Sequence, residues 1–308
     1  MMNDRFLTPY NIENTLRWTG LFGIISIGAA FVIVTGGIDL SIGSVIGLSG
    51  VMLPKLLVEQ GFSPWLAVPL VLVMAGLIGL THGLLITKLK LQPFVVTLCG
   101  LMIYRGAARY ITSDATLGFG TGYAGMKKWV KGSLIENFSG ATDGFDMPMA
   151  FVYLIAIAII ASIFLNLTVW GRYLYALGNN EEATRLSGVR TDRIVILAYV
   201  VCAMLAGFAG MMFAVDVNSV QPSSHGNFYE LYAIAGAVLG GCSLRGGEGA
   251  VLGVIFGAAI LRVLYNAINI LGIATELEFA VIGVVILAGV TADELIKRWA
   301  ASRQLKST

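Results

Sequence analysis

Nine apolar segments, separated by polar connections, run through the chain of 308 residues. A helix needs about 20 mostly apolar residues to cross the hydrocarbon core of a bilayer. The segments cover residues 18–35, 42–58, 64–86, 93–111, 148–169, 194–216, 229–241, 250–271 and 275–296. Two of them, 42–58 and 229–241, are short and broken by glycines, which a membrane tolerates only where other helices or a cavity satisfy the backbone. The pattern predicts an all-α, polytopic membrane protein with about nine transmembrane helices in one domain over residues 1–308.

The low content of charged residues excludes the soluble alternatives. Charged residues make up 12% of the chain and hydrophobic residues 57%, and the mean hydropathy is +0.82. A typical soluble domain carries about 25% charged residues. The composition therefore excludes an ordinary cytosolic enzyme, a disordered chain and a disulfide scaffold. The net charge of +2 gives no indication of a nucleic-acid partner.

The distribution of cations predicts how the chain is oriented. Cytoplasmic loops of membrane proteins carry an excess of Lys and Arg. Nine alternating crossings place the C-terminus, which holds Lys297, Arg298, Arg303 and Lys306, on the same side as the connections 88–90 and 171–193. We therefore expect 171–193 to be a cytoplasmic loop and 112–147 to be an extracytoplasmic loop.

Two glycine-rich turns resemble each other. Both turns have a glycine pair, Gly36 and Gly37 in the first and Gly240 and Gly241 in the second, followed by a leucine and by a later glycine, Gly43 or Gly249, that opens the next helix. The first turn also contains Asp39 and Ser41. Paired glycines allow a sharp reversal with positive φ, and we expect a close backbone approach at Gly241. Asp39 or Ser41 can cap the next helix, although Asp39 could also serve a proton relay or a cation site. The likeness indicates either internal symmetry, which is common in transporters, or only the general similarity of glycine-rich membrane turns.

Residues 180–188 have the signals of a short, capped helix. The residues concerned are Asn180, Glu181, Glu182, Ala183, Arg185, Leu186 and Gly188. Asn180 is a good N-cap, the two glutamates suit the positive end of the helix dipole, and Gly188 suits a left-handed C-terminal position. Ala183 and Leu186 lie on one face. Such a helix is too short to be stable alone, so it either docks a partner or lies against its own protein.

The sequence carries no recognisable catalytic or metal-binding pattern. It contains neither G-x-x-x-x-G-K-[ST] nor H-E-x-x-H, and its three cysteines lie in apolar stretches without metal-like spacing. We therefore expect no enzyme activity, no metal and no cofactor in this chain. Polar residues in or near membrane spans usually face the bundle interior or a water-filled path. Asn218, Asn266 and Asn269 are candidates for lining such a path, although the last two could equally hydrogen-bond a neighbouring helix.

Four sequence blocks together resemble a known family. They are TGGIDLSIGS at 35–44, QPFVVTL at 92–98 with YRG at 104–106, GRYLYALG at 171–178 running into EATRLSG at 182–188, and the stretch from YELYAIA at 229–235 through GGCSL at 240–244 to Gly253. Taken in this order, they are similar to the permease subunits of the monosaccharide, ribose-type class of bacterial ABC importers. Members usually have one more span before the first apolar segment of this chain, so nine crossings stand where ten are expected.

The resemblance implies a transport subunit in the bacterial inner membrane that moves a ribose-like sugar. It implies a second permease subunit, as a homodimer or heterodimer, and a periplasmic or lipid-anchored sugar-binding protein. It also implies a cytoplasmic ATPase that binds the ATP and docks on a coupling helix, which residues 180–188 match. The alternatives are an ABC permease for a nucleoside, a quorum signal or a branched-chain amino acid. A secondary transporter or membrane enzyme, active without an ATPase partner, is a more distant alternative.

Overall fold

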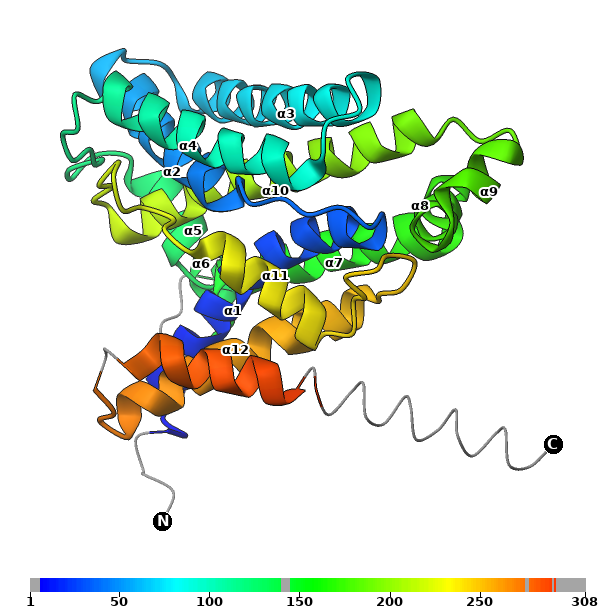
Figure 1. The fold of residues 1–308 in the computed structure, drawn as a ribbon. Coiled ribbons are helices and arrows are strands. Elements are labelled where there is room, and N and C mark those ends of the chain that lie inside the picture. Colours follow the sequence, from blue (N-terminus) through cyan, green and yellow to red (C-terminus); the bar gives the residue numbers. More distant parts are fainter. Residues whose placement is uncertain (1–5, 140–144, 275–276, 290, 292–308) are drawn as a thin grey trace.

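The computed structural model describes residues 6–139, 145–274, 277–289 and 291, and this part of the chain is all-α (Figure 1). Seven helices are long and apolar enough to cross a membrane. They are α1 (Pro9–Val34), α2 (Ile42–Pro54) with its π-helical extension η1 (Lys55–Glu59), α3 (Pro64–Lys88), α4 (Pro93–Ile111), α7 (Met149–Leu167), α10 (Thr191–Val217) and α12 (Val251–Ile270). The predicted fold class, an all-α polytopic membrane protein, is confirmed.

Two of the nine predicted crossings are shorter helices. The segment 229–241 forms α11 (Tyr229–Leu239), whose 11 residues span about 16 Å, roughly half of the hydrocarbon thickness. The segment 275–296 contains the helix Glu278–Gly289, and its other parts lie largely outside the described residues. The cationic C-terminus used in the orientation argument also lies outside them. Helix α11 ends just before Gly240, the first residue of the glycine pair that closes the predicted segment.

Helix α1 forms the centre of the bundle. It contacts α7, α10, α11 and α12, and every residue from Thr19 to Val34 is buried. A Cβ on Gly20 would lie 2.4 Å from the carbonyl carbon of Ala150 in α7, so the two backbones can approach only because Gly20 has no side chain. The helix begins at Pro9 rather than at residue 18, because Thr8 caps it and proline suits the first helical position.

The bundle has two ends with different structures (Figure 1). We call one the loop end: it carries α5 (Ala124–Lys131) and α6 (Leu134–Ser139), which interrupt the predicted loop 112–147. We call the other the α9 end: it carries α8 (Val169–Asn179) and α9 (Glu181–Leu186). Helices α5, α6 and α8 were not predicted, because each is too short or too polar to stand out as an apolar segment.

Helices α2 and α11 both begin inside the bundle. The chain after α1 turns back from the α9 end (Figure 1). The carbonyl of Ile38 then accepts a hydrogen bond from Tyr199, which lies about 12 Å along α10 from its start. Tyr229, the first residue of α11, packs its ring 4.8 Å from that of Phe22, the midpoint of α1. Gly43, at the start of α2, lies against the backbone of Gly226, just before α11, so the two helices begin side by side. From there α2 runs to the loop end and α11 to the α9 end. Broken helices that start at mid-membrane are a recurring feature of transporters.

Candidate solute cavity and docking helix

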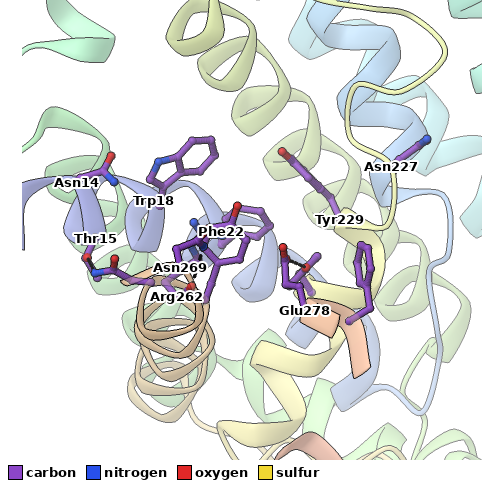
Figure 2. A pocket seen from close by; sticks show the side chains of 13 residues that line it. Asn14, Thr15, Trp18, Phe22, Asn227, Tyr229, Arg262, Asn269 and Glu278 are labelled. Carbon is purple, nitrogen blue, oxygen red and sulfur yellow. Dashed lines mark hydrogen bonds between the residues drawn. The ribbon is translucent and has the colours of Figure 1, made fainter. Parts of the chain in front are cut away.

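A cavity of about 370 Å³ lies between α1, α11, α12 and the helix Glu278–Gly289 (Figure 2). Ligand pockets measure roughly 300–1,000 Å³. The lining residues are Asn14, Thr15, Trp18, Phe22, Asn227, Tyr229, Tyr232, Arg262, Tyr265, Asn266, Asn269, Glu278 and Phe279. Aromatic rings alternate here with amide and charged groups, a combination that suits a small polar solute with apolar faces.

Two helix faces build this cavity by regular spacing. On α1, Thr15, Trp18 and Phe22 follow one another at intervals of three and four residues and so share a face. On α12, Arg262 is followed three and four residues later by Tyr265 and Asn266, and Asn269 lies four and three residues beyond these, so the four also share a face. These residues lie in the half of each helix nearer the loop end, so the cavity is on that side of the bundle centre.

Two hydrogen bonds connect the walls of the cavity. The Asn266 amide donates to the hydroxyl of Thr15 at 2.9 Å, which joins α12 to α1. The Tyr232 hydroxyl donates to the carboxylate of Glu278 at 3.0 Å, which joins α11 to the last described helix. Both bonds are drawn in Figure 2. Since each bond links two helices, it fixes the width of the cavity.

Arg262 is a buried cation in the cavity wall. Arg262 is 9% exposed. Its guanidinium carbon lies 5.1 Å from the ring centroid of Trp18, 4.9 Å from that of Phe22 and 4.3 Å from that of Tyr265. In Figure 2 its side chain points from α12 toward Phe22 of α1. A cation over aromatic faces gains roughly 2 kcal/mol or more where water is excluded. The aromatic residues of the wall therefore stabilise a charge that the apolar surroundings disfavour.

The three asparagines predicted to line a path have different locations. Asn266 and Asn269 line the cavity, and Asn266 also bonds the neighbouring helix. Asn218 lies outside the cavity at the end of α10, where it accepts the N–H of Phe119 and donates to the carbonyl of Gly120. The sequence prediction did not select Trp18 or Arg262 for this site, although the three-and-four spacing on α12 could have found the arginine.

A second polar cluster lies where α2 and α11 begin. Arg105 of α4 donates to the carbonyl oxygens of Pro222, His225 and Gly43. The buried carboxylate of Glu230, in the first turn of α11, lies directly against Gly43, where a Cβ would be 2.1 Å from the Glu230 Oε2 atom. Irregular backbone inside a membrane is tolerated only where such groups satisfy it. Arg105 and Glu230 therefore hold the two half-helices together.

In the first glycine turn the side-chain hydrogen bonds differ from the predicted capping of α2. Asp39, which is 3% exposed, accepts both the N–H and the hydroxyl of Ser41, at 2.8 Å and 2.6 Å. The Ser41 side chain makes no capping bond to α2, because its hydroxyl is turned back to Asp39. Gly36 has the expected positive φ of 79°. Asp39 thus orders the turn that leads into α2.

In the second turn the close approach occurs one residue earlier than predicted. A Cβ on Gly240 would lie 2.5 Å from the carbonyl oxygen of Gly253 in α12. At Gly241 no described atom lies within 4 Å of such a Cβ, and the residue is needed instead for its φ of +88°. Gly249 has a φ of +158° and packs against Cys242. Gly240 is therefore required for close packing against α12, and Gly241 is required for the reversal of the chain.

Residues 180–188 form a short, exposed helix. The Asn180 side chain accepts the N–H of Ala183 at 2.9 Å, and Gly188 has a φ of +85°. Leu186 is 81% exposed, and Ala183 on the same face is exposed as well. Thr184 is the buried residue of α9. The apolar face of α9 therefore points away from the rest of the described chain.

Glycine contacts attach α8, and with it α9, to the bundle. A Cβ on Gly178 would lie 1.9 Å from the carbonyl oxygen of Val34 at the end of α1, and 2.3 Å from the nitrogen of Gly247. The same Gly247 nitrogen donates to Val34 at 2.9 Å. Tyr175 of α8 adds a hydrogen bond to the carbonyl of Gly249 at 2.8 Å. The short helices at this end are thereby connected to α1 and α12, both of which line the cavity.

A bundle of apolar helices with half-helices meeting at its centre defines a multi-pass membrane permease. The chain belongs to the family described as branched-chain amino acid transport system / permease component, whose model matches residues 11–290. It is accordingly a multi-pass protein of the inner membrane.

Relatives within the family confirm the predicted resemblance to sugar permeases. The ribose import permease protein RbsC of Bacillus subtilis is 36% identical over 95% of this chain and 87% of its own length. The D-allose transport system permease protein AlsC of Escherichia coli is 31% identical over 96% and 86%. The fructose import permease protein FrcC of Rhizobium meliloti is 28% identical over 98% and 82%. No solved structure matches the chain.

Proposed function

We propose that the chain is the membrane-spanning permease subunit of an ATP-driven importer that moves a monosaccharide, ribose or a related sugar, into the cell. The observation that carries this proposal is the 36% identity to a ribose import permease over 95% of the chain. The cavity supports it, because its rings can pack on the C–H faces of a sugar while its amide groups hydrogen-bond the hydroxyls.

In this proposal the α9 end lies in the cytoplasm and the loop end outside, and the distribution of cations supports this orientation. Positively charged residues in short connections favour the cytoplasmic side. The α9 end carries Lys88, Lys90, Arg172, Arg185, Arg190, Arg193 and Arg245. Two of them, Lys88 and Lys90, pair with Asp192. In this orientation the cavity lies nearer the outside, where a binding protein delivers the solute.

Helix α9 is the docking site for a separate cytoplasmic ATPase in this proposal. The exposed Leu186 and Ala183 offer an apolar contact, and Glu182 and Arg185 offer charges beside it. The ATPase binds and hydrolyses ATP, while this chain supplies the path. A second permease subunit and a periplasmic or lipid-anchored sugar-binding protein complete the importer.

The test is to co-express the chain with candidate ATPase and sugar-binding proteins from the same genome. We expect the ATPase to co-purify with the chain, and its hydrolysis to rise when the binding protein is loaded with sugar. A panel of ribose, allose, fructose, a nucleoside and leucine distinguishes sugars from the other solutes. Equal ATP hydrolysis with empty and sugar-loaded binding protein would contradict the proposal.

A further inference from the structure

The cavity wall contains a buried cation whose hydrogen-bonding capacity is not fully used. The Nε of Arg262 has no hydrogen-bond partner among the described residues, and no described carboxylate lies within ion-pair distance of its guanidinium. The three rings around it attract the charge but do not replace strong oxygen acceptors. A buried donor without an acceptor is costly. The site therefore gains most from a molecule that brings oxygen atoms into the cavity.

The charges around the cavity limit what that molecule can be. Among the described lining residues Arg262 is the cation and Glu278 is the anion, so these residues together carry no net charge. The amides of Asn14, Asn227 and Asn269 can each donate and accept. An anionic solute would bring its charge near Glu278, and a cationic one near Arg262. A neutral solute with several hydroxyl groups avoids both repulsions.

We propose that this cavity is a binding site of the permease chain itself for a neutral polyhydroxylated solute, and that Arg262 is its specificity-determining residue. The planar guanidinium offers parallel N–H groups to neighbouring hydroxyl oxygens, and the rings of Trp18 and Tyr265 pack against it. The choice of a sugar as the solute rests on the proposed function. The site selects sugars over sugar acids and sugar phosphates.

The experiment measures binding to the isolated chain, without ATPase or binding protein. The purified chain in lipid nanodiscs is dialysed to equilibrium against radiolabelled D-ribose, with D-ribonate as the anionic competitor. We expect saturable binding that excess ribose displaces and ribonate does not. Arg262→Met, which keeps an unbranched side chain and removes the donors, should weaken binding about tenfold or more. Arg262→Lys should also weaken it, because an ammonium lacks the planar fork.

The matched control is Arg109→Met. Arg109 is exposed at the end of α4 and pairs with Asp114, away from the cavity, so ribose affinity should stay unchanged. Unchanged affinity in Arg262→Met, or displacement of ribose by ribonate, would overturn the proposal. If Arg262→Met does not fold, as judged by its melting temperature, Arg262→Lys and Asn269→Leu carry the test, and wild-type affinity in both overturns it.

Uptake measured in parallel separates the two proposals. ATP-driven uptake without ribose binding to the isolated chain refutes the site and leaves the proposed function standing. Ribose binding without ATP-driven uptake refutes the function and leaves the site standing.

Discussion

Gly43 and Gly226 meet backbone to backbone at the point where α2 and α11 begin. A Cβ on Gly43 would lie 2.3 Å from the carbonyl oxygen of Gly226, and one on Gly226 would lie 2.4 Å from that of Gly43. We expect Gly43→Ala to destabilise the protein by about 1–3 kcal/mol, because the added methyl overfills a packed junction. Gly76→Ala in α3 is the control, since its Cβ would meet Met204 at an ordinary 3.5 Å. Equal melting temperatures of the two purified variants would show that the junction tolerates a side chain.

The Arg105 side chain is expected to stabilise the same junction. Arg105→Met leaves the carbonyls of Pro222, His225 and Gly43 without this donor, and we expect a loss of about 1–3 kcal/mol. Arg109→Met, one helical turn further along α4, removes an exposed ion pair with Asp114, and water screens such a pair, so we expect a smaller loss of stability. Thermal unfolding of both variants in the same detergent compares them. A larger loss in the Arg109 variant would refute the role of Arg105.

The docking proposal predicts a specific loss at α9. Leu186→Asp should abolish co-purification of the ATPase without lowering the melting temperature of the chain, because Leu186 is 81% exposed. The charge reversals Glu182→Lys and Arg185→Glu should uncouple transport from ATP hydrolysis while leaving membrane insertion intact. Leu271→Asp is the control, since Leu271 is similarly exposed but lies at the loop end. Normal ATP-driven uptake by all three α9 variants would remove α9 as the docking site.

We expect Gly240 and Gly241 to differ in how well they tolerate an added side chain. Gly241→Asn should cost roughly 1 kcal/mol or less, because asparagine accepts a left-handed conformation and the site is open. Gly240→Ala should cost more, because its methyl would meet the backbone of Gly253. The yield and melting temperature of each variant measure this. A larger loss of stability in Gly241→Asn than in Gly240→Ala would contradict this, because it would mean that the backbone conformation at Gly241 matters more than the packing at Gly240.

The sequence predicted the apolar helices well, because each long span is a continuous apolar run. It could not predict that α11 begins in the middle of the bundle, since Tyr229–Leu239 has the same composition as a piece of a full crossing. The depth of its start is set by contacts with Phe22 and Gly43, which are distant in the sequence. Helix α8 was missed for a similar reason, because only its packing at Gly178 distinguishes it from a polar loop.

The candidate site was predicted in part. Asn266 and Asn269 were selected because polar residues in spans face the interior, and both line the cavity. Trp18 was treated as the start of an apolar run, since an aromatic residue there is equally typical of a core or of a membrane interface. Its role follows only from the approach of Arg262, 5.1 Å away on α12. Composition and spacing do not predict which side chains meet when two helices far apart in the sequence pack together.

The most direct test of the proposed function is uptake by proteoliposomes that contain the chain and its ATPase, with binding protein outside and ATP inside. The account predicts that radiolabelled ribose or a related monosaccharide accumulates inside above its outside concentration only when ATP is hydrolysed. It also predicts that Leu186→Asp abolishes this accumulation. Accumulation without the ATPase subunit, or ATP hydrolysis that never moves a sugar, would contradict it.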